Sequence, residues 1–235
     1  MQAGGKTVFL EGAMGAGKTT LSLELAEALG PYTLLCREPD EKGGLNPYLS
    51  DYYGDAGRWS FTMQAHLLSL RYRMHLQAQW HCMNTGHHAV MDRSFQGDTA
   101  FARLQLKHGL MGQREFETYR SLYHAMTASV LLPNFCIVLK VDPEVSARRI
   151  NQRMQEEEGR GCEVAVDLQY LSDLNQEIEH MALVLKNQGV QVIEVPWNQD
   201  RLSKEDRKPV VDGLVQQILD HEPEDLFLDL HRRTI

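Results

Sequence analysis

Residues 7–20, TVFLEGAMGAGKTT, run from a short apolar stretch into a glycine-rich turn. Within them, Gly12, Gly17, Lys18 and Thr19 match every fixed position of the phosphate-binding pattern G-x-x-x-x-G-K-[ST]. Glycine adopts backbone angles that are closed to other residues, so successive N–H groups of such a turn can point inward at phosphate oxygens. The stretch therefore predicts a buried strand, a phosphate-binding loop (P-loop) and the start of a helix.

The end of this loop supplies the groups that a nucleoside triphosphate needs. We expect the Lys18 ammonium on the β- and γ-phosphates, the Thr19 hydroxyl on Mg²⁺, and the positive end of the next helix at the phosphates. A chance glycine-rich turn is the alternative, but Val8–Leu10 has the pattern of a strand and Leu21–Leu29 that of an amphipathic helix, as the motif requires. The predicted ATP contacts in the loop are Gly12, Ala13, Met14, Gly15, Ala16, Gly17, Lys18, Thr19 and Thr20.

Length and charge limit the class of protein. The chain has 235 residues, 43% of them hydrophobic, which is enough for one sizeable core, and we expect a single domain over residues 1–235. The formal net charge of −8 argues against nucleic acid as the main ligand, because binding a phosphate backbone needs basic surface. We find no signal-peptide pattern and no apolar run that could span a bilayer, so we expect a cytoplasmic protein with no membrane partner. The cysteines lack C-x-x-C spacing and are expected to be reduced: Cys36, Cys82, Cys136 and Cys162.

Apolar stretches alternate with helical ones along the chain. We predict strands at Val8–Leu10, Tyr32–Cys36, His87–Met91, Phe135–Val141 and Val190–Val195. We predict helices at Leu21–Leu29, 46–80, 104–132 with a break near Gly109 and Gly112, from Pro143 onward, Leu168–Leu185 and Pro209–Leu219. This order predicts an α/β fold, a P-loop NTPase-type five-stranded parallel sheet with helices on both faces and a site at the carboxyl ends of the strands. An acidic tail at about 222–235 could dock on the domain or on a partner, which the pattern leaves open.

Charged residues follow the second and third predicted strands. Glu38 comes just after the second strand, where a fixed carboxylate can accept a proton from a hydroxyl that attacks a phosphate. Asp92 and Arg93 follow the third strand, where the carboxylate could orient Mg²⁺ or its waters and the guanidinium could neutralise a transferred phosphoryl group. Asp98 is close enough in sequence to reach the same pocket. An exposed loop carboxylate is the alternative for Glu38.

Gln64 and Arg71 are two helical turns apart and therefore project from one face of their helix. An amide and a guanidinium among aromatic side chains suit a site that encloses a planar heterocycle. The alternative is that the aromatic residues form core and the polar pair faces water.

The helix after Pro143 is rich in arginine and leads into the glycine-containing stretch 159–161. Arg149 and Arg153 are one turn apart and share a face, which favours contact with phosphates in a lid over the nucleotide, at about residues 149–166. A solvated helix with charge pairs along its surface is the alternative.

Together these motifs resemble the deoxyribonucleoside kinase family, which includes the deoxycytidine, deoxyguanosine and deoxyadenosine kinases and their insect and viral relatives. The resemblance runs from about Val8 to about Leu174. It rests on the P-loop, Glu38-Pro39, the run 53–71 with Arg58-Trp59-Ser60-Phe61 and Gln64, Asp92-Arg93-Ser94, Asp98 and the arginine-rich lid.

The resemblance implies transfer of the ATP γ-phosphate to the 5′-hydroxyl of a deoxynucleoside in nucleotide salvage, with Mg²⁺ as cofactor. Glu38 would be the general base, and Arg93 and Lys18 would hold and neutralise the phosphoryl group. Gln64 would bind the base edge. The family usually has Glu where this chain has Asp92, which keeps the charge and shortens the reach.

The resemblance also assigns contacts to the sugar and to the lid. Tyr53 and Glu158 would hold the 3′-hydroxyl, and Arg149 and Arg153 would be lid arginines. The lid is a few residues longer here than is usual, so Glu157 is an equal candidate for the sugar contact. Members of the family are usually dimers through helices beside the substrate pocket, which implies a homodimer.

Arg71 and Asp98 match a pair that the deoxycytidine and purine kinases carry and the thymidine-accepting insect type lacks. An arginine held by a carboxylate presents donors to a carbonyl or ring nitrogen, and the carboxylate can accept from an amino group. The pair therefore predicts a preference for deoxyadenosine or deoxyguanosine, with deoxycytidine close behind.

Two other functions fit parts of the pattern. A thymidylate kinase or other nucleoside monophosphate kinase would share the P-loop and Arg37-Glu38-Pro39, but the acidic residues at 40 and 41 are unfavourable beside an incoming phosphate. A non-catalytic P-loop switch would use ATP to change partners. Such a switch would need neither Glu38 nor the face of Gln64 and Arg71.

Overall fold

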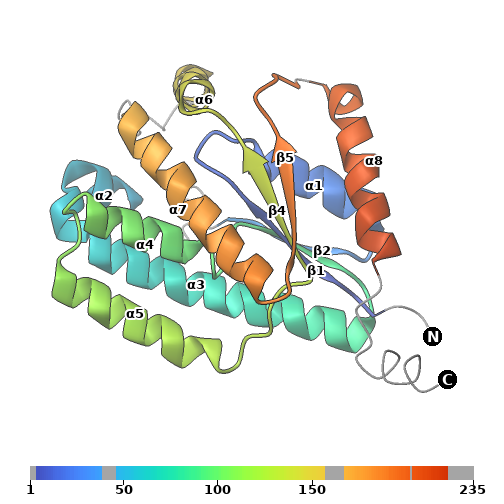
Figure 1. The fold of residues 1–235 in the computed structure, drawn as a ribbon, viewed down its shortest axis with the longest axis horizontal. Coiled ribbons are helices and arrows are strands. Elements are labelled where there is room, and N and C mark those ends of the chain that lie inside the picture. Colours follow the sequence, from blue (N-terminus) through green and yellow to red (C-terminus); the bar gives the residue numbers. More distant parts are fainter. Residues whose placement is uncertain (1–3, 39–45, 157–166, 202, 222–235) are drawn as a thin grey trace.

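The computed structural model describes residues 4–38, 46–156, 167–201 and 203–221 (Figure 1). Pro39, Cys162, most of the predicted lid with Glu157 and Glu158, and the acidic tail lie outside these ranges. Over the ranges that it describes, no helix is both long and apolar enough to cross a membrane.

A single parallel sheet forms the centre of the molecule. Its strands are β1 (Thr7–Glu11), β2 (Leu34–Cys36), β3 (Ala89–Asp92), β4 (Phe135–Lys140) and β5 (Gln191–Pro196). Their order across the sheet is β2-β3-β1-β4-β5, and every pairing is parallel. The predicted five-stranded parallel sheet is therefore confirmed, and the first strand lies at its centre.

Helices cover both faces of the sheet, as predicted (Figure 1). They are α1 (Lys18–Leu29), α2 (Leu49–Gly54), α3 (Ala56–Thr85), α4 (Asp98–Lys107), α5 (Gln113–Thr127), α6 (Pro143–Glu156), α7 (Leu168–Asn187) and α8 (Lys204–Asp220). Side chains of α1 and α8 pack on one face, and those of α3, α4 and α7 pack on the other.

Successive side chains of β1 point to opposite faces of the sheet, and this divides the core in two. Val8 and Leu10 pack with Leu21 and Leu25 of α1, whereas Phe9 points to the other face and packs with Ala78 of α3. Both faces of the strand are covered, so its apolar residues are continuous in sequence. The strand that leads into the P-loop is thus buried on both sides.

Three helical boundaries differ from the sequence prediction. The predicted helix 46–80 is two helices, since the Asp55 side chain accepts from the Arg58 N–H and starts α3. The predicted helix 104–132 begins earlier, at Asp98, and is α4 and α5, with the break near the glycines as expected. The last helix starts before Pro209, because Ser203 and Asp206 form a capping box at its N-terminus.

We expect Leu10→Ala to lower the free energy of unfolding by about 2–5 kcal/mol, because it leaves a cavity in the central strand. The Leu10 side chain is 0% exposed and lies in the cluster under α1 and α8. Urea unfolding followed by circular dichroism measures the loss. The matched control is Leu23→Ala in α1, where the side chain is 39% exposed. Equal losses in the two variants would contradict the burial of β1.

Candidate active site

The P-loop adopts the conformation that its glycines permit. Gly15 and Gly17 have φ angles of 73° and 86°, in the left-handed region. A Cβ at Gly15 would lie 2.9 Å from the Ser146 carbonyl oxygen of α6, and one at Gly17 would lie 3.1 Å from Nε1 of Trp197. Side chains at these two positions would therefore be both strained and crowded. The loop lies between α6 and the segment that follows β5.

Lys18 is buried at the start of α1 and turns back into the loop. Its Nζ donates to the carbonyl oxygens of Gly12 and Ala13 at 3.1 and 2.9 Å. Burial, together with the positive charge of Arg93, lowers its pKa to about 8. No side chain in the described ranges caps the N-terminus of α1, so the first N–H groups of the helix remain open to an anion.

Thr19 and Asp92 meet where α1 begins and β3 ends. The Thr19 hydroxyl donates to Asp92 Oδ2 at 2.5 Å. Asp92 Oδ1 is buried and has no hydrogen-bond partner among the described residues, and burial raises the pKa of this carboxyl. A hydroxyl beside a carboxylate oxygen without a partner is a donor set that suits Mg²⁺, which prefers oxygen ligands. The two residues that the sequence pointed to therefore fit this ion.

Glu38 lies just beyond β2 and is held by two arginines. Its Oε1 accepts from Arg93 Nε at 2.7 Å and from Arg71 Nη2 at 2.9 Å. Burial opposes ionisation, but the two guanidinium groups outweigh it and lower the pKa of the Glu38 carboxyl to about 2. The side chain is 33% exposed, and the described residues offer no partner to Oε2. Glu38 is therefore ionised at neutral pH, with one oxygen held and the other open.

Arg93 is fixed from several sides. It is the one described non-glycine residue with a positive φ, at 71°, and its backbone N–H donates to the Leu10 carbonyl at 3.0 Å. The guanidinium lies over the Phe101 ring, 4.5 Å from its centre. A strained backbone angle that the surroundings hold in place is common at functional sites. Arg93 therefore presents its charge to Glu38 with little freedom to move.

Glu11 supports this arrangement from inside the sheet. It ends β1, is fully buried, and accepts from the Ser94 backbone N–H at 2.7 Å and from the Ser94 hydroxyl at 2.5 Å. Burial raises the pKa of its carboxyl, while Arg93, 3.8 Å away, opposes that shift. Our sequence reasoning gave Glu11 no role. The available signal was a carboxylate inside an otherwise apolar strand.

The predicted residues for base recognition form a second cluster, on α3 and α4. Arg71 donates through Nη1 to Asp98 Oδ1, so it joins Asp98 to Glu38. Gln64 donates to the Asp98 carbonyl at 3.2 Å and accepts from Gln105 Nε2 at 3.2 Å. Asp98 Oδ2 also accepts from the Tyr119 hydroxyl at 2.6 Å. The shared face of Gln64 and Arg71 is confirmed, and it is buried rather than facing water.

The fold and this geometry can now be compared with known proteins. A family model described as deoxynucleoside kinase matches residues 8–220. The chain belongs to the deoxynucleoside kinase family.

Two curated deoxynucleoside kinases of Dictyostelium discoideum are similar in sequence. The deoxyguanosine kinase is 33% identical over 193 residues, which cover 82% of this chain and 64% of that protein. The deoxyadenosine kinase is 31% identical over 195 residues, covering 83% of this chain and 74% of that protein. The chain thus spans somewhat less than two thirds of the length of the first relative.

A solved structure of the deoxyadenosine kinase of M. mycoides with bound dATP has the same fold. It superposes with a TM-score of 0.71 at 24% sequence identity, covering 89% of this chain and 98% of that one. At this identity the likeness confirms the fold alone.

The other predicted site residues that the structure describes lie on α2 and α6. Tyr53 of α2 packs edge-on against Tyr52, with ring centres 5.7 Å apart. Arg149 of α6 donates to the carbonyl oxygens of Trp197 and Gln199, both at 3.0 Å. Arg153 follows one turn later and is half-buried. The helix predicted to begin the lid is thus anchored to the segment after β5 on the P-loop side.

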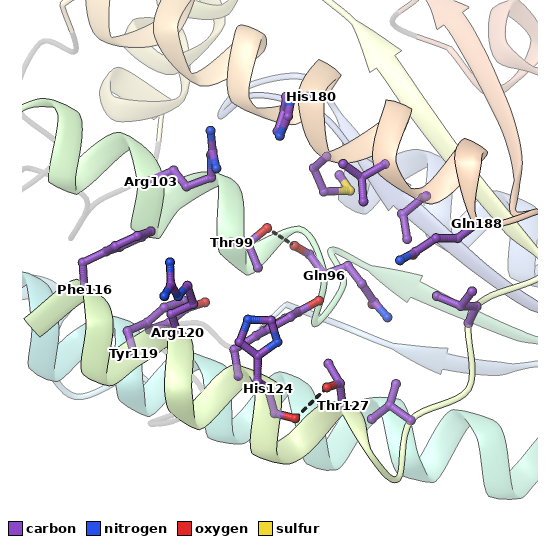
Figure 2. Close-up of a pocket in the computed structure, with 16 residues that line it drawn as sticks. Gln96, Thr99, Arg103, Phe116, Tyr119, Arg120, His124, Thr127, His180 and Gln188 are labelled. Atoms are coloured by element: carbon purple, nitrogen blue, oxygen red, sulfur yellow. Dashed lines mark hydrogen bonds between the residues drawn. The ribbon is translucent and has the colours of Figure 1, made fainter.

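A separate cavity of about 560 Å³ lies between α4, α5 and α7 (Figure 2). Arg103, His124 and His180 stand around it, and Tyr119 and Met181 lie among its apolar lining. No P-loop residue lines this cavity. It shares Tyr119 with the base-recognition cluster.

We expect Gly97→Ala to destabilise this member of the deoxynucleoside kinase family by about 1–3 kcal/mol, because the new methyl group overpacks a buried site. A Cβ there would lie 2.1 Å from Oε1 of Glu11, which also holds Ser94. Urea unfolding and phosphoryl transfer are measured together, and both are expected to fall. The control is Gly213→Ala in α8, which meets open space and should be neutral or stabilising. Wild-type behaviour of Gly97→Ala would show that the Glu11 support is dispensable.

Proposed function

We propose that this protein transfers the γ-phosphate of ATP to the 5′-hydroxyl of a deoxynucleoside, with Glu38 as general base. One observation carries the proposal. The Glu38 carboxylate is ionised, is held through Oε1 by Arg71 and Arg93, and keeps Oε2 open on the strand-end side of the P-loop. The names of the relatives, a deoxyguanosine and a deoxyadenosine kinase, support this substrate class.

In the proposed reaction, the 5′-oxygen forms a bond to the γ-phosphorus as the bond to the β-phosphate oxygen breaks, and the hydroxyl proton passes to Glu38 Oε2. A carboxylate with a pKa of about 2 is a weak base. It serves here because phosphoryl transfer passes through a loose transition state, in which positioning matters more than early removal of the proton. Orientation of the hydroxyl is thus the main task that we assign to Glu38.

Three groups would handle the charge of the triphosphate. Arg93 contacts Glu38 and can reach the phosphoryl group beside it, and Lys18 exchanges its two loop carbonyls for phosphate oxygens. Thr19 and Asp92 would hold Mg²⁺, which when bound neutralises charge on the β- and γ-phosphates. Arg149 and Arg153 would add positive charge from the lid, and Tyr53 with Glu158 would hold the sugar.

We assign base recognition to Gln64, Arg71 and Asp98, with deoxyadenosine or deoxyguanosine preferred and deoxycytidine close behind. Arg71 would donate to the base and Asp98 would accept from it, and both side chains are buried. The amide of Gln64 already has two partners, so base binding would exchange its bond with Gln105. Thymine offers no exocyclic amine to the carboxylate, which is the basis of the expected discrimination.

The two alternatives receive less support. In a monophosphate kinase Arg37 would grip the phosphate of the substrate, but its side chain is exposed and has no ion pair among the described residues. A nucleotide switch has no use for a carboxylate held by two arginines next to a buried amide and guanidinium. The family assignment favours the nucleoside as acceptor over either alternative.

We further propose one kinase domain that forms a homodimer in the cytoplasm. Leu183 and Val184 are neighbours on α7 and are 56% and 42% exposed, and Val184 also lines the cavity between α4, α5 and α7. Apolar side chains that cluster on one surface favour burial against a second subunit. The described cysteines Cys36, Cys82 and Cys136 are free and buried, which supports a reducing compartment.

A substrate panel tests the activity. Deoxyadenosine, deoxyguanosine, deoxycytidine, thymidine and thymidine monophosphate are each supplied with ATP and Mg²⁺, and products are measured by chromatography. We expect the purine deoxynucleosides to react best. We expect Glu38→Gln to lower kcat about 10²–10⁴-fold with ATP binding retained, because the variant loses the charged carboxylate that orients the hydroxyl and accepts its proton while the P-loop is unchanged. The control is Glu27→Gln, in which an exposed α1 carboxylate is changed. Thymidine or its monophosphate as best substrate, or full turnover by Glu38→Gln, would refute the assignment.

Light scattering on a size-exclusion column tests the dimer. We expect the wild type to elute with twice the mass of one chain and Leu183→Glu to elute as a monomer, because a carboxylate in an apolar interface costs several kcal/mol, on the order of 2–5. Leu23→Glu on α1, outside that surface, is the control. A monomeric wild type would contradict the proposal.

A further inference from the structure

Tyr119 lies on α5, a helix for which we predicted no chemical role. Its side chain is 2% exposed, which makes it one of the largest buried side chains of the protein. The phenol donates to Asp98 Oδ2 at 2.6 Å, while Arg71 occupies Oδ1 of the same carboxylate. Both oxygens of Asp98 therefore have a donor that fixes the plane of the carboxylate.

The need for this second donor follows from burial. Asp98 is completely buried, and a buried carboxylate is tolerated only when its oxygens are paired. The Asp98 carboxylate would be free to turn about its last side-chain bond if Arg71 alone held it. The Tyr119 hydroxyl removes that freedom, because its own ring is locked by packing between α3 and α4.

The way in which Asp98 is held determines the orientation of the Arg71 guanidinium. Its two terminal nitrogens are committed, Nη1 to Asp98 and Nη2 to Glu38. The third nitrogen, Nε, is buried and has no hydrogen-bond partner among the described residues. A guanidinium held through both terminal nitrogens presents its Nε–H in one fixed direction. A buried N–H without a partner calls for an acceptor.

We propose that Tyr119 is a positioning residue for base selectivity. It holds Asp98 so that Arg71 keeps its Nε–H directed at a ring nitrogen or carbonyl oxygen of the incoming base, without moving Nη2 from Glu38. The inference rests on the proposed function and deepens it. Loss of the phenol hydroxyl lets the Asp98–Arg71 pair rotate, which weakens binding of the preferred base and leaves the ATP site untouched.

Tyr119→Phe tests the role, because it removes only the hydroxyl. The matched control is Tyr123→Phe, one turn later on α5, whose ring stacks on Phe95 and whose hydroxyl makes no hydrogen bond with a described residue. For both variants and the wild type, kcat and KM are measured for ATP and for each of the four deoxynucleosides. Thermal unfolding of the three proteins is recorded alongside.

We expect Tyr119→Phe to raise KM for the preferred deoxynucleoside about tenfold, the effect of one hydrogen bond to a charged group. The selectivity ratio over thymidine falls by a similar factor, while KM for ATP stays within about twofold, since selectivity here depends on the base contacts alone. Tyr123→Phe keeps wild-type values. These three results together support the positioning role.

Other results overturn it. A uniform loss of kcat for all substrates with unchanged KM values, together with a lower unfolding temperature, would show that the phenol only stabilises the fold. Equal behaviour of Tyr119→Phe and Tyr123→Phe would also contradict the role. A wild type that phosphorylates no deoxynucleoside refutes the proposed function itself, and the role of Tyr119 with it. An active wild type together with a Tyr119→Phe variant that keeps wild-type selectivity overturns the role of Tyr119 and leaves that function intact.

Discussion

The sharing of the Arg71 guanidinium between Glu38 and Asp98 is the contact on which the rest of the site depends. Each carboxylate would be costly to hold near the strand ends without a cation, and each needs a fixed direction to act. One arginine satisfies both requirements, and Arg93 adds a second cation to Glu38. The carboxylate to which we assign proton transfer and the pair to which we assign base recognition are therefore parts of one ionic network.

The sheet makes this network possible by its strand order. Because β3 lies between β2 and β1, the residues that follow these three strands meet at one edge. Glu38 follows β2, Asp92 ends β3, and Gly12 follows β1. The pairing of Leu10 with Asp92 brings the end of β3 level with the start of the P-loop. Residues far apart in sequence thus come together without long side chains or long loops.

Much of this could be predicted from sequence, because it depends on local pattern. The strands are short apolar runs, and the P-loop has a fixed spacing, so the fold and the places of Lys18, Glu38 and Asp92 followed from them. Other features depend on contacts across the fold. Glu11 accepts from Ser94 and Tyr119 donates to Asp98, and both contacts join residues that no short motif links. Glu11 is marked only as a carboxylate in an apolar strand, and Tyr119 has no pattern that separates it from an ordinary helix residue. The predicted start of the last helix at Pro209 was wrong, because the capping box at Ser203 starts α8 earlier.

The pairing of Glu38 with arginines has a consequence for the protein before any ligand arrives. Since the carboxylate is already matched by two guanidinium groups, an empty site does not leave an unpaired anion at the strand ends. The charge of this acidic group is therefore balanced within the chain itself.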